Sequence, residues 1–345
     1  MKPQSILTTT LLALLCAAAT ATANTVIDTV TIGNPGNPAD TNSLNSNTGL
    51  PDLGGVSYTY GIGKYDVTLT QYCVFLNAVA KTDTYGLYST SLTTDLNVAG
   101  ISRSGSSGNY NYAVIGSGQR PVTYVSWLDA ARYCNWLHNG QPTGLQTAAT
   151  TEAGAYTLNG DTTRGLEIHN SNALYWIPTE NEWYKAAYYD PGIAGANKYW
   201  TYATRSNVAP GNIVGSGANM ANYYTNMGSH VYSVTQSGSF SGTQNCLTDV
   251  GAFTGSASAY GLFDQNGDVW NWNDATFFSS RGLRGGSWFG GSSNLLSSTQ
   301  GADDPTLKNY DVGFRIATVA TAPEPASAVL LLGGGALLAL RRRRA

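Results

Sequence analysis

The chain has 345 residues, of which 18 are Lys or Arg and 21 are Asp or Glu, so only 11% are charged. Without Lys2, Glu324 and the four terminal arginines, the body holds 13 basic and 20 acidic residues. This mildly acidic balance argues against a nucleic-acid partner, because phosphate binding needs a basic face. The 40 glycines, 22 tyrosines and 8 tryptophans favour a folded, loop-rich domain with an aromatic core.

The first residues have the pattern of a secretory signal. Lys2 supplies a positive start, an apolar stretch runs from Ile6 to Ala19, and a small-x-small pattern ends at Ala23. We therefore expect a signal peptide over residues 1–23 and a mature start near Asn24.

The body begins with a lead-in over residues 24–55 that is rich in Asn, Pro, Gly and Thr, and we expect it to be mostly irregular. A first strand is expected near Val30–Ile32, and alternation from Tyr58 to Tyr65 predicts another. Long stretches rich in Gly, Ser and Asn, above all residues 191–260, show no sustained periodic spacing of apolar residues.

Three amphipathic helices are the clearest local predictions. Apolar residues at helical spacing indicate a helix over residues 69–80 and a second over residues 127–137, with Ser126 as its N-cap. Thr179 and Glu182 have the spacing of a capping box that opens a third helix through Ala187.

Few residues suit redox or metal chemistry. Three cysteines remain after signal removal. Export to an oxidising compartment permits one disulfide with the third thiol left over, and free buried thiols are the alternative. The three histidines are spread without metal-ligand spacing. These residues are Cys73, Cys134, Cys246, His138, His169 and His230.

Several segments in order carry a family resemblance that covers about residues 56–318. They are Tyr65-Asp66-Val67-Thr68, Arg120–Trp127, Trp176–Trp183, Tyr260–Asp264, Gly267–Trp272, Arg284–Trp288 and Gly313–Arg315. This series resembles the sulfatase-modifying factor family, whose best-known member is formylglycine-generating enzyme. The resemblance implies an α+β, C-type-lectin-like fold with little regular secondary structure. It also implies bound calcium and, in the enzyme itself, copper held by two cysteines.

The cysteines that the resemblance implies are missing here. They follow the Arg-Gly-Gly-Ser element, and their positions fall on Gly290 and Leu295. Neither residue can be a thiolate, bind Cu(I) or carry out redox chemistry. We therefore expect no copper and no catalytic residue at these positions.

The element that the resemblance links to calcium also departs from the family pattern. Gly-Asn-x-Trp-Glu-Trp becomes Gly267–Trp272, which places an amide at Asn271 where a carboxylate is expected. Less charge lowers calcium affinity, although carbonyl and amide oxygens still serve as ligands. The implied ligands are the backbone oxygens of Asn266, Gly267 and Val269 together with Asn271, and Asp268 is either a compensating carboxylate or a turn residue. Calcium remains an open expectation.

The segment after the glycine pair is our candidate ligand surface. It contains Trp288, Phe289, Ser292 and Asn294, although Trp288 and Phe289 also suit a core. Arg284 and Arg315 are interpreted as structural residues that pin loops, and Glu180 and Glu182 as helix-capping residues.

Two functional hypotheses follow from these residues. One is a non-catalytic domain that binds a carbohydrate or protein ligand; the alternative is an oxidoreductase of the family, forming formylglycine or catalysing a related oxidation.

The C-terminal end is a second targeting pattern. Pro323-Glu324-Pro325 precedes an uncharged stretch from Ala326 to Leu340 and the arginines from Arg341 to Arg344. This order resembles the PEP-CTERM sorting signal, which implies an exosortase-type partner and export linked to extracellular polysaccharide. The stretch is shorter than the ~20 residues of a usual membrane span, so we expect a transient inner-membrane contact through residues 319–345. After sorting, the expected location is the periplasm, the outer surface or the extracellular matrix.

Overall fold

The computed structural model describes residues 24–41, 52–225 and 230–320. The predicted signal peptide and the Pro-Glu-Pro tail lie outside these residues. In the part of the chain that is described, no helix combines the length and the hydrophobicity that a membrane crossing needs.

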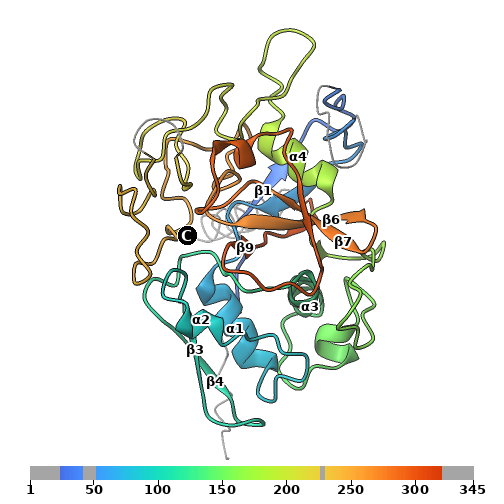
Figure 1. Cartoon of the computed structure of the whole chain (residues 1–345). Helices are drawn as coiled ribbons and strands as arrows, with labels where there is room; N and C mark the ends of the chain where they lie inside the picture. The colour runs from blue at the N-terminus through green and yellow to red at the C-terminus, as the bar shows by residue number, and fades with distance from the viewer. Residues whose placement is uncertain (1–23, 42–51, 226–229, 321–345) are drawn as a thin grey trace, which may run out of the picture.

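Short helices and strands are separated by long loops (Figure 1). The helices are α1 (Leu69–Val79), α2 (Ser91–Thr94), α3 (Trp127–His138) and α4 (Glu180–Tyr188), with a π-helical turn at Ala148–Glu152 and a 3-10 turn at Ser292–Leu295. The strands are β1 (Thr29–Ile32), β2 (Tyr60–Gly63), β3 (Ile101–Ser104), β4 (Asn111–Val114), β5 (Tyr175–Trp176), β6 (Trp270–Phe277), β7 (Ser280–Arg284), β8 (Gly301–Asp303), β9 (Val312–Gly313) and β10 (Ala317–Val319).

The three predicted helices and both predicted strands are confirmed to within a few residues. Each long helix begins at a capping box. The side chain of the N-cap residue accepts a hydrogen bond from the backbone amide of residue N3, and the side chain of N3 accepts one from the backbone amide of the N-cap residue. The caps are Thr68 for α1, Ser126 for α3 and Thr179 for α4. The described part of residues 191–260 contains no helix or strand, as the missing period predicted.

Two small four-stranded sheets organise the domain. One has the order β1-β2-β10-β5 and brings the two ends of the domain together, since β2 lies between β1 and β10. The other has the order β8-β7-β6-β9, with β6 parallel to β9 and antiparallel to β7. In Figure 1, α1 and α3 lie below the strands, α4 lies above them, and the loops of residues 191–260 follow mainly one side.

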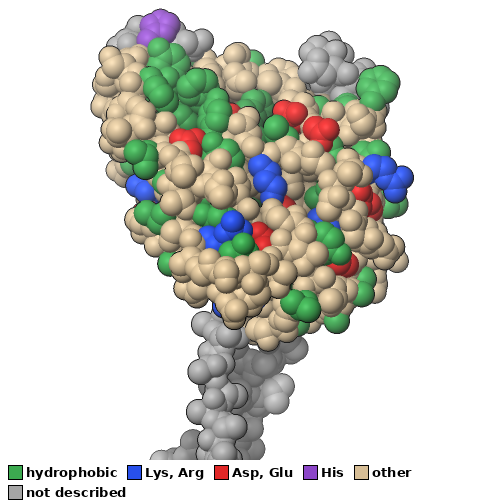
Figure 2. Space-filling model, turned by 60° about the horizontal axis from the view of Figure 1, so that its bottom comes forward, with side chains coloured by type: hydrophobic (Ala, Val, Ile, Leu, Met, Phe, Trp, Pro, Cys, Tyr) green, Lys and Arg blue, Asp and Glu red, His purple; other side chains and the backbone are tan. Residues whose placement is uncertain are grey.

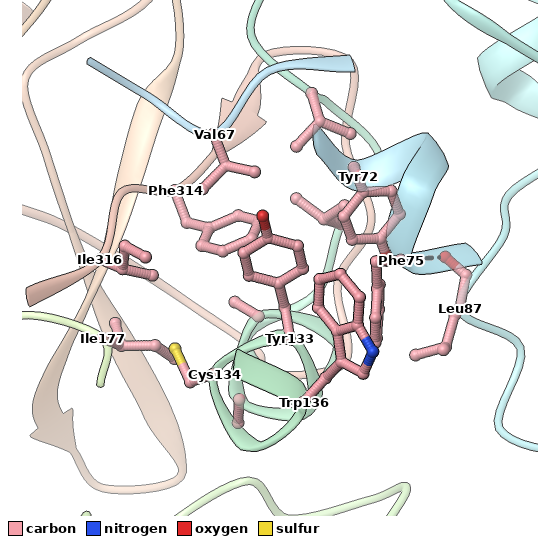
Figure 3. Close-up of a cluster of buried hydrophobic side chains, with 14 of the residues drawn as sticks. Val67, Tyr72, Phe75, Leu87, Tyr133, Cys134, Trp136, Ile177, Phe314 and Ile316 are labelled. Atoms are coloured by element: carbon pink, nitrogen blue, oxygen red, sulfur yellow. Dashed lines mark hydrogen bonds between the residues drawn. The ribbon is translucent and has the colours of Figure 1, made fainter. Parts of the chain in front are cut away.

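The main core is aromatic, as the composition suggested. Tyr133 and Trp136 on α3 contact Phe75 on α1, with ring centroids 5.2 and 5.3 Å away, and Phe314 closes the cluster from the β9–β10 segment (Figure 3). Edge-to-face and tilted ring pairs of this kind add to the free energy gained by burying apolar area. This core anchors the helices against the strands whose ends carry the candidate site.

The first described residues are tied to the body. Gln141, just after α3, accepts from the Thr25 amide at 2.7 Å and donates to the Thr25 carbonyl at 2.8 Å. Gln71 on α1 donates to the Val26 carbonyl, and β1 then pairs with β2. The lead-in is therefore fixed to the domain over residues 24–32.

Candidate functional site

A pair of glycines bends the chain directly after β7. Gly285 and Gly286 have φ of 101° and 75°, in the left-handed region that glycine tolerates best. A Cβ on Gly286 would lie 2.6 Å from Leu295 Cδ2 and 3.1 Å from the Asn294 backbone. The second glycine therefore lets the 3-10 turn at Ser292–Leu295 pack directly against the bend.

The two positions predicted for redox cysteines have different surroundings. Leu295 is 0% exposed and packs in an apolar cluster with Tyr202, Ala221 and Tyr223. Gly290 is partly exposed, and its carbonyl accepts from the Tyr224 amide at 3.0 Å. Leu295 is thus part of the packed core, and Gly290 is held by a backbone hydrogen bond.

Arg284 and Arg315 are structural residues, as predicted. Both Nε and Nη2 of Arg284 donate to Glu180 Oε1, and Nη1 donates to the Ser297 and Thr299 carbonyls. Glu180 therefore does more than cap α4. Arg315 pairs with Asp66 at 2.9 Å and donates to the carbonyls of Gly63 and Phe263. Each guanidinium is buried and joins loops that are far apart in the sequence.

Asn271 uses its side chain inside the protein. Its Oδ1 accepts from Trp183 Nε1 and from Arg315 Nε, both at 3.0 Å. Its Nδ2 donates to the Val269 carbonyl at 3.2 Å, so two of the four implied calcium ligands bond to each other. A calcium ion on Asn271 Oδ1 would have to displace a buried guanidinium of the same charge sign. The donor set at Asn271 does not fit calcium.

The Asn266 side chain and the Gly267 amide are engaged in loop contacts. Asn266 Oδ1 accepts from the Ala203 amide at 2.7 Å, and its Nδ2 donates to the Leu295 carbonyl at 2.8 Å. The Gly267 amide donates to the Gly285 carbonyl. Within residues 24–41, 52–225 and 230–320, no three His, Cys, Asp or Glu side chains gather so as to hold a metal.

Asp268 is a buried turn residue that pins two loops. Its carboxylate accepts from the Asn222 side-chain amide at 2.8 Å and from the amide and hydroxyl of Thr248 at 3.2 and 2.8 Å. Burial, followed by the negative charge of Asp264, raises the pKa of Asp268 well above its ordinary value. These contacts support the interpretation of Asp268 as a turn residue.

The predicted ligand residues separate into a core and a surface group. Trp288 is 2% exposed and packs with Val98, Cys246 and Val269, whereas Phe289 is 44% exposed. Ser292 and Asn294 are partly exposed on the 3-10 turn. Trp288 is therefore a core residue, and Phe289 presents a ring to solvent.

Phe289 belongs to an aromatic patch that the sequence analysis missed. We define the patch as Tyr232, Phe240, Trp288, Phe289 and Tyr310, whose neighbouring ring centroids lie 5.3 to 6.5 Å apart. Phe240 is 53% exposed. Figure 2 shows hydrophobic side chains gathered at the upper left of that face. His230 and Tyr232 both lie beside Tyr224, with ring centroids 6.3 and 4.6 Å away. No local pattern joins these residues, because they come from three separate loops.

A cavity of about 600 Å³ lies elsewhere in the domain. It is lined by residues 24–28, by Tyr65 to Thr68 and by part of α1, including Gln71. None of the predicted site residues lines it. The cavity is therefore separate from the positions that the sequence singled out.

The comparisons with known proteins decide the family. A family model described as the sulfatase-modifying factor enzyme 1-like domain matches residues 20–320. The chain belongs to this family. The α+β, C-type-lectin-like fold with low regular secondary structure is thereby confirmed.

Several solved structures are similar to this chain at low sequence identity. Treponema denticola variable protein 1 is 19% identical, with a TM-score of 0.50 over 84% of this chain and 94% of that chain. The structure of CarF is 21% identical, with a TM-score of 0.45 over 85% and 98%. PvdO from Pseudomonas aeruginosa is 17% identical, with a TM-score of 0.43 over 85% and 92%. A search of the curated proteins gave no match.

The three thiols within the described residues of this family member are buried and free. Cys73 and Cys134 lie in the main core, where Cys134 sits beside Ile177 (Figure 3), and Cys246 lies in the cluster that contains Trp288. Burial raises the pKa of Cys246 to about 11, so its thiol is protonated and a poor nucleophile or metal ligand. A single protonated thiol near Trp288 does not replace the family's cysteine pair.

Proposed function

We propose that this protein is a non-catalytic, ligand-binding member of the sulfatase-modifying factor family. The observation that carries the proposal is Leu295, a fully buried leucine in an apolar cluster at one predicted cysteine position. Gly290 at the other position has no side chain. Copper-dependent oxidation needs thiolate ligands, and Cys246, the thiol in the cluster that contains Trp288, is buried and protonated.

The surface proposed for the ligand is the aromatic patch around Phe289. Exposed aromatic rings next to Ser, Asn and Gly-rich loops suit a carbohydrate or a protein ligand, because a ring face packs against apolar groups while the rim forms hydrogen bonds. Ser292 and Asn294 lie on the neighbouring 3-10 turn and supply such polar groups.

We also propose that the domain acts outside the cytoplasm. The support is in the sequence: a signal pattern over residues 1–23 and a Pro-Glu-Pro tail that resembles a sorting signal. An exosortase-type partner would release the body from a transient inner-membrane contact. The body would then act in the periplasm, at the outer surface or in the extracellular matrix.

Neither copper nor a calcium ion at Asn271 is part of the proposed function. The reason for copper is the missing thiolate pair. The reason for calcium is the engagement of Asn271 by Trp183 and Arg315, described above. The Gly267–Trp272 element is proposed to be held by internal hydrogen bonds instead.

The test is a direct assay for the alternative oxidation. Purified body, residues 24–320, would be incubated with copper and a peptide that carries the sulfatase motif Cys-x-Pro-x-Arg, beside an active formylglycine-generating enzyme. We expect the peptide mass to change only with the active enzyme. Conversion of the peptide cysteine to an aldehyde by this protein would refute the proposal.

A further inference from the structure

The exposed part of the aromatic patch is small. Phe240 and Phe289 are 53% and 44% exposed, while the Trp288 ring beneath them is buried. An aromatic side chain has about 150–250 Å² of surface, so the two exposed rings present roughly 200 Å². A stable protein interface uses about 800 Å² per partner. The patch therefore matches one or two rings of a small ligand or polymer better than a protein surface.

The charge beside the patch is negative. Asp311 follows Tyr310 directly in the chain. Asp95 accepts from the hydroxyl of Tyr124 at 2.6 Å, and Tyr124 packs against the same cluster as Trp288 and Tyr310. Asp311 accepts from the Ser287 hydroxyl at 2.9 Å. Neither carboxylate forms an ion pair with a Lys, Arg or His side chain in the described ranges.

A buried donor in the patch also lacks a partner. Trp288 Nε1 has no hydrogen-bond acceptor in the described structure, although the side chain is 2% exposed. The centroid of its ring lies 6.5, 5.3 and 5.8 Å from the ring centroids of Phe240, Phe289 and Tyr310. Buried donors without an acceptor are rare, so this indole is an unusual feature of the patch.

We propose that the aromatic patch binds a glycan that contains amino sugars with free, positively charged amines. The apolar face of each sugar packs on Phe240 or Phe289, and sugar hydroxyls reach the polar rim. The ammonium group lies toward Asp95 and Asp311, because aromatic faces favour a cation and so do carboxylates that have no ion-pair partner within the described ranges. Anionic glycans are disfavoured because they meet like charge. This inference rests on the proposed ligand-binding function and names its ligand class.

The test compares oligosaccharides of equal length that differ in charge. Glucosamine oligomers, their fully N-acetylated counterparts and oligogalacturonates would be titrated into the purified body by calorimetry. We expect glucosamine oligomers to bind at least tenfold more tightly than the other two. Binding of N-acetylated or acidic oligomers with equal or greater affinity overturns this inference and leaves the proposed function standing. If no glycan binds, the inference fails, and a protein pull-down without a partner removes the proposed function as well.

Variants connect the binding to the patch. Phe289→Ala is expected to weaken glucosamine binding on the order of tenfold, because a stacking face is lost. Asp95→Asn keeps an oxygen for the Tyr124 hydroxyl but removes the charge, and we expect about fivefold weaker binding and less sensitivity to salt. Phe278→Ala is the matched control, since Phe278 is fully exposed at the β6–β7 turn. Equal affinity of Phe289→Ala and Phe278→Ala would place the ligand elsewhere, and thermal unfolding of each variant verifies its fold.

Discussion

Replacing Asp264 with asparagine is expected to stabilise the domain at neutral and alkaline pH. The Asp264 carboxylate accepts from the Gly251 amide at 2.6 Å. Burial, and next the negative charge of Asp66, raise the pKa of Asp264 to about 7, although the Gly251 amide and Arg315 oppose this increase. Ionised Asp264 is therefore unfavourable in the folded protein, and a neutral amide removes that charge.

The pH dependence has a defined sign. An aspartate in an unfolded chain has a pKa of about 3.9, so between about pH 4 and 7 the folded state binds a proton that the unfolded state has lost. The free energy of unfolding therefore falls as pH rises through this window and is level above it. Burial raises the pKa of Asp66 to about 6, so this group also lowers the free energy of unfolding as pH rises.

The expected size follows from the same pKa values. A change in pKa from about 4 to about 7 corresponds to about 4 kcal/mol at high pH. Partial exposure of Asp264 and its interaction with Asp66 reduce the expected gain in Asp264→Asn to about 2 kcal/mol at about pH 8. Asparagine also tolerates the positive φ of 60° at this position and keeps an acceptor for Gly251.

Urea unfolding followed by tryptophan fluorescence would measure this effect at about pH 5 and pH 8. We expect the variant to be more stable at the higher pH and to show a flatter dependence on pH. Asp28→Asn is the control, because Asp28 is exposed and its charge contributes little to stability. A loss of stability at pH 8 would show that the Asp264 carboxylate is favourable when ionised, and an unchanged slope would show that folding does not raise its pKa.

Two further predictions concern the positions at which this chain departs from its family. Leu295→Ala should lower the free energy of unfolding by about 2–5 kcal/mol, because it leaves a cavity in a buried cluster, and Leu296→Ala, at a partly exposed neighbour, should cost less in the same urea assay. Calcium or EDTA should leave the melting temperature unchanged in differential scanning calorimetry, because Asn271 Oδ1 is occupied by internal donors. Stabilisation by calcium that disappears in Asn271→Ala would contradict this reasoning.

The helices could be predicted because their signals are local. Ser126 and Asp129, three residues apart, satisfy each other's backbone amides at 3.1 and 2.9 Å, and the same spacing recurs at Thr179 and Glu182. Such a signal depends only on one turn of chain and not on the rest of the fold. The order of motifs along the chain likewise gave the family and the fold class.

The hairpin β6–β7 was missed because buried polar residues hide its pattern. Asn271, Asn273, Arg281 and Arg284 are all buried within these two strands, so the sequence does not alternate between apolar and polar residues. Their hydrogen-bond partners lie far away in sequence, as with Arg284 and Glu180. A single sequence gives no local sign that a polar side chain will be paired inside the core.

The aromatic patch was beyond sequence reasoning for a related cause. Phe240 and Phe289 are 49 positions apart, yet their ring centroids lie 6.4 Å apart because the long loop of residues 230–245 folds back onto the segment after β7. Loops without a period carry no register from which such a contact could be inferred. Only Trp288 and Phe289 were singled out in advance, and the structure separates them into a buried ring and an exposed one.

The bend after β7 also bears on whether lost chemistry could return by simple substitution. A Cβ on Gly286 would collide with Leu295, so the glycine and the leucine form one packed unit together with Tyr202 and Tyr223. Leu295→Cys would remove apolar volume from this cluster and place the new thiol in surroundings that raise its pKa. A cysteine at Gly290 would instead lie at a partly exposed position, with its Cβ about 3.3 Å from the Asn294 side chain. The two thiols would differ in solvation and in ionisation. We therefore expect the double substitution to destabilise the domain without producing a matched pair of thiolates for copper.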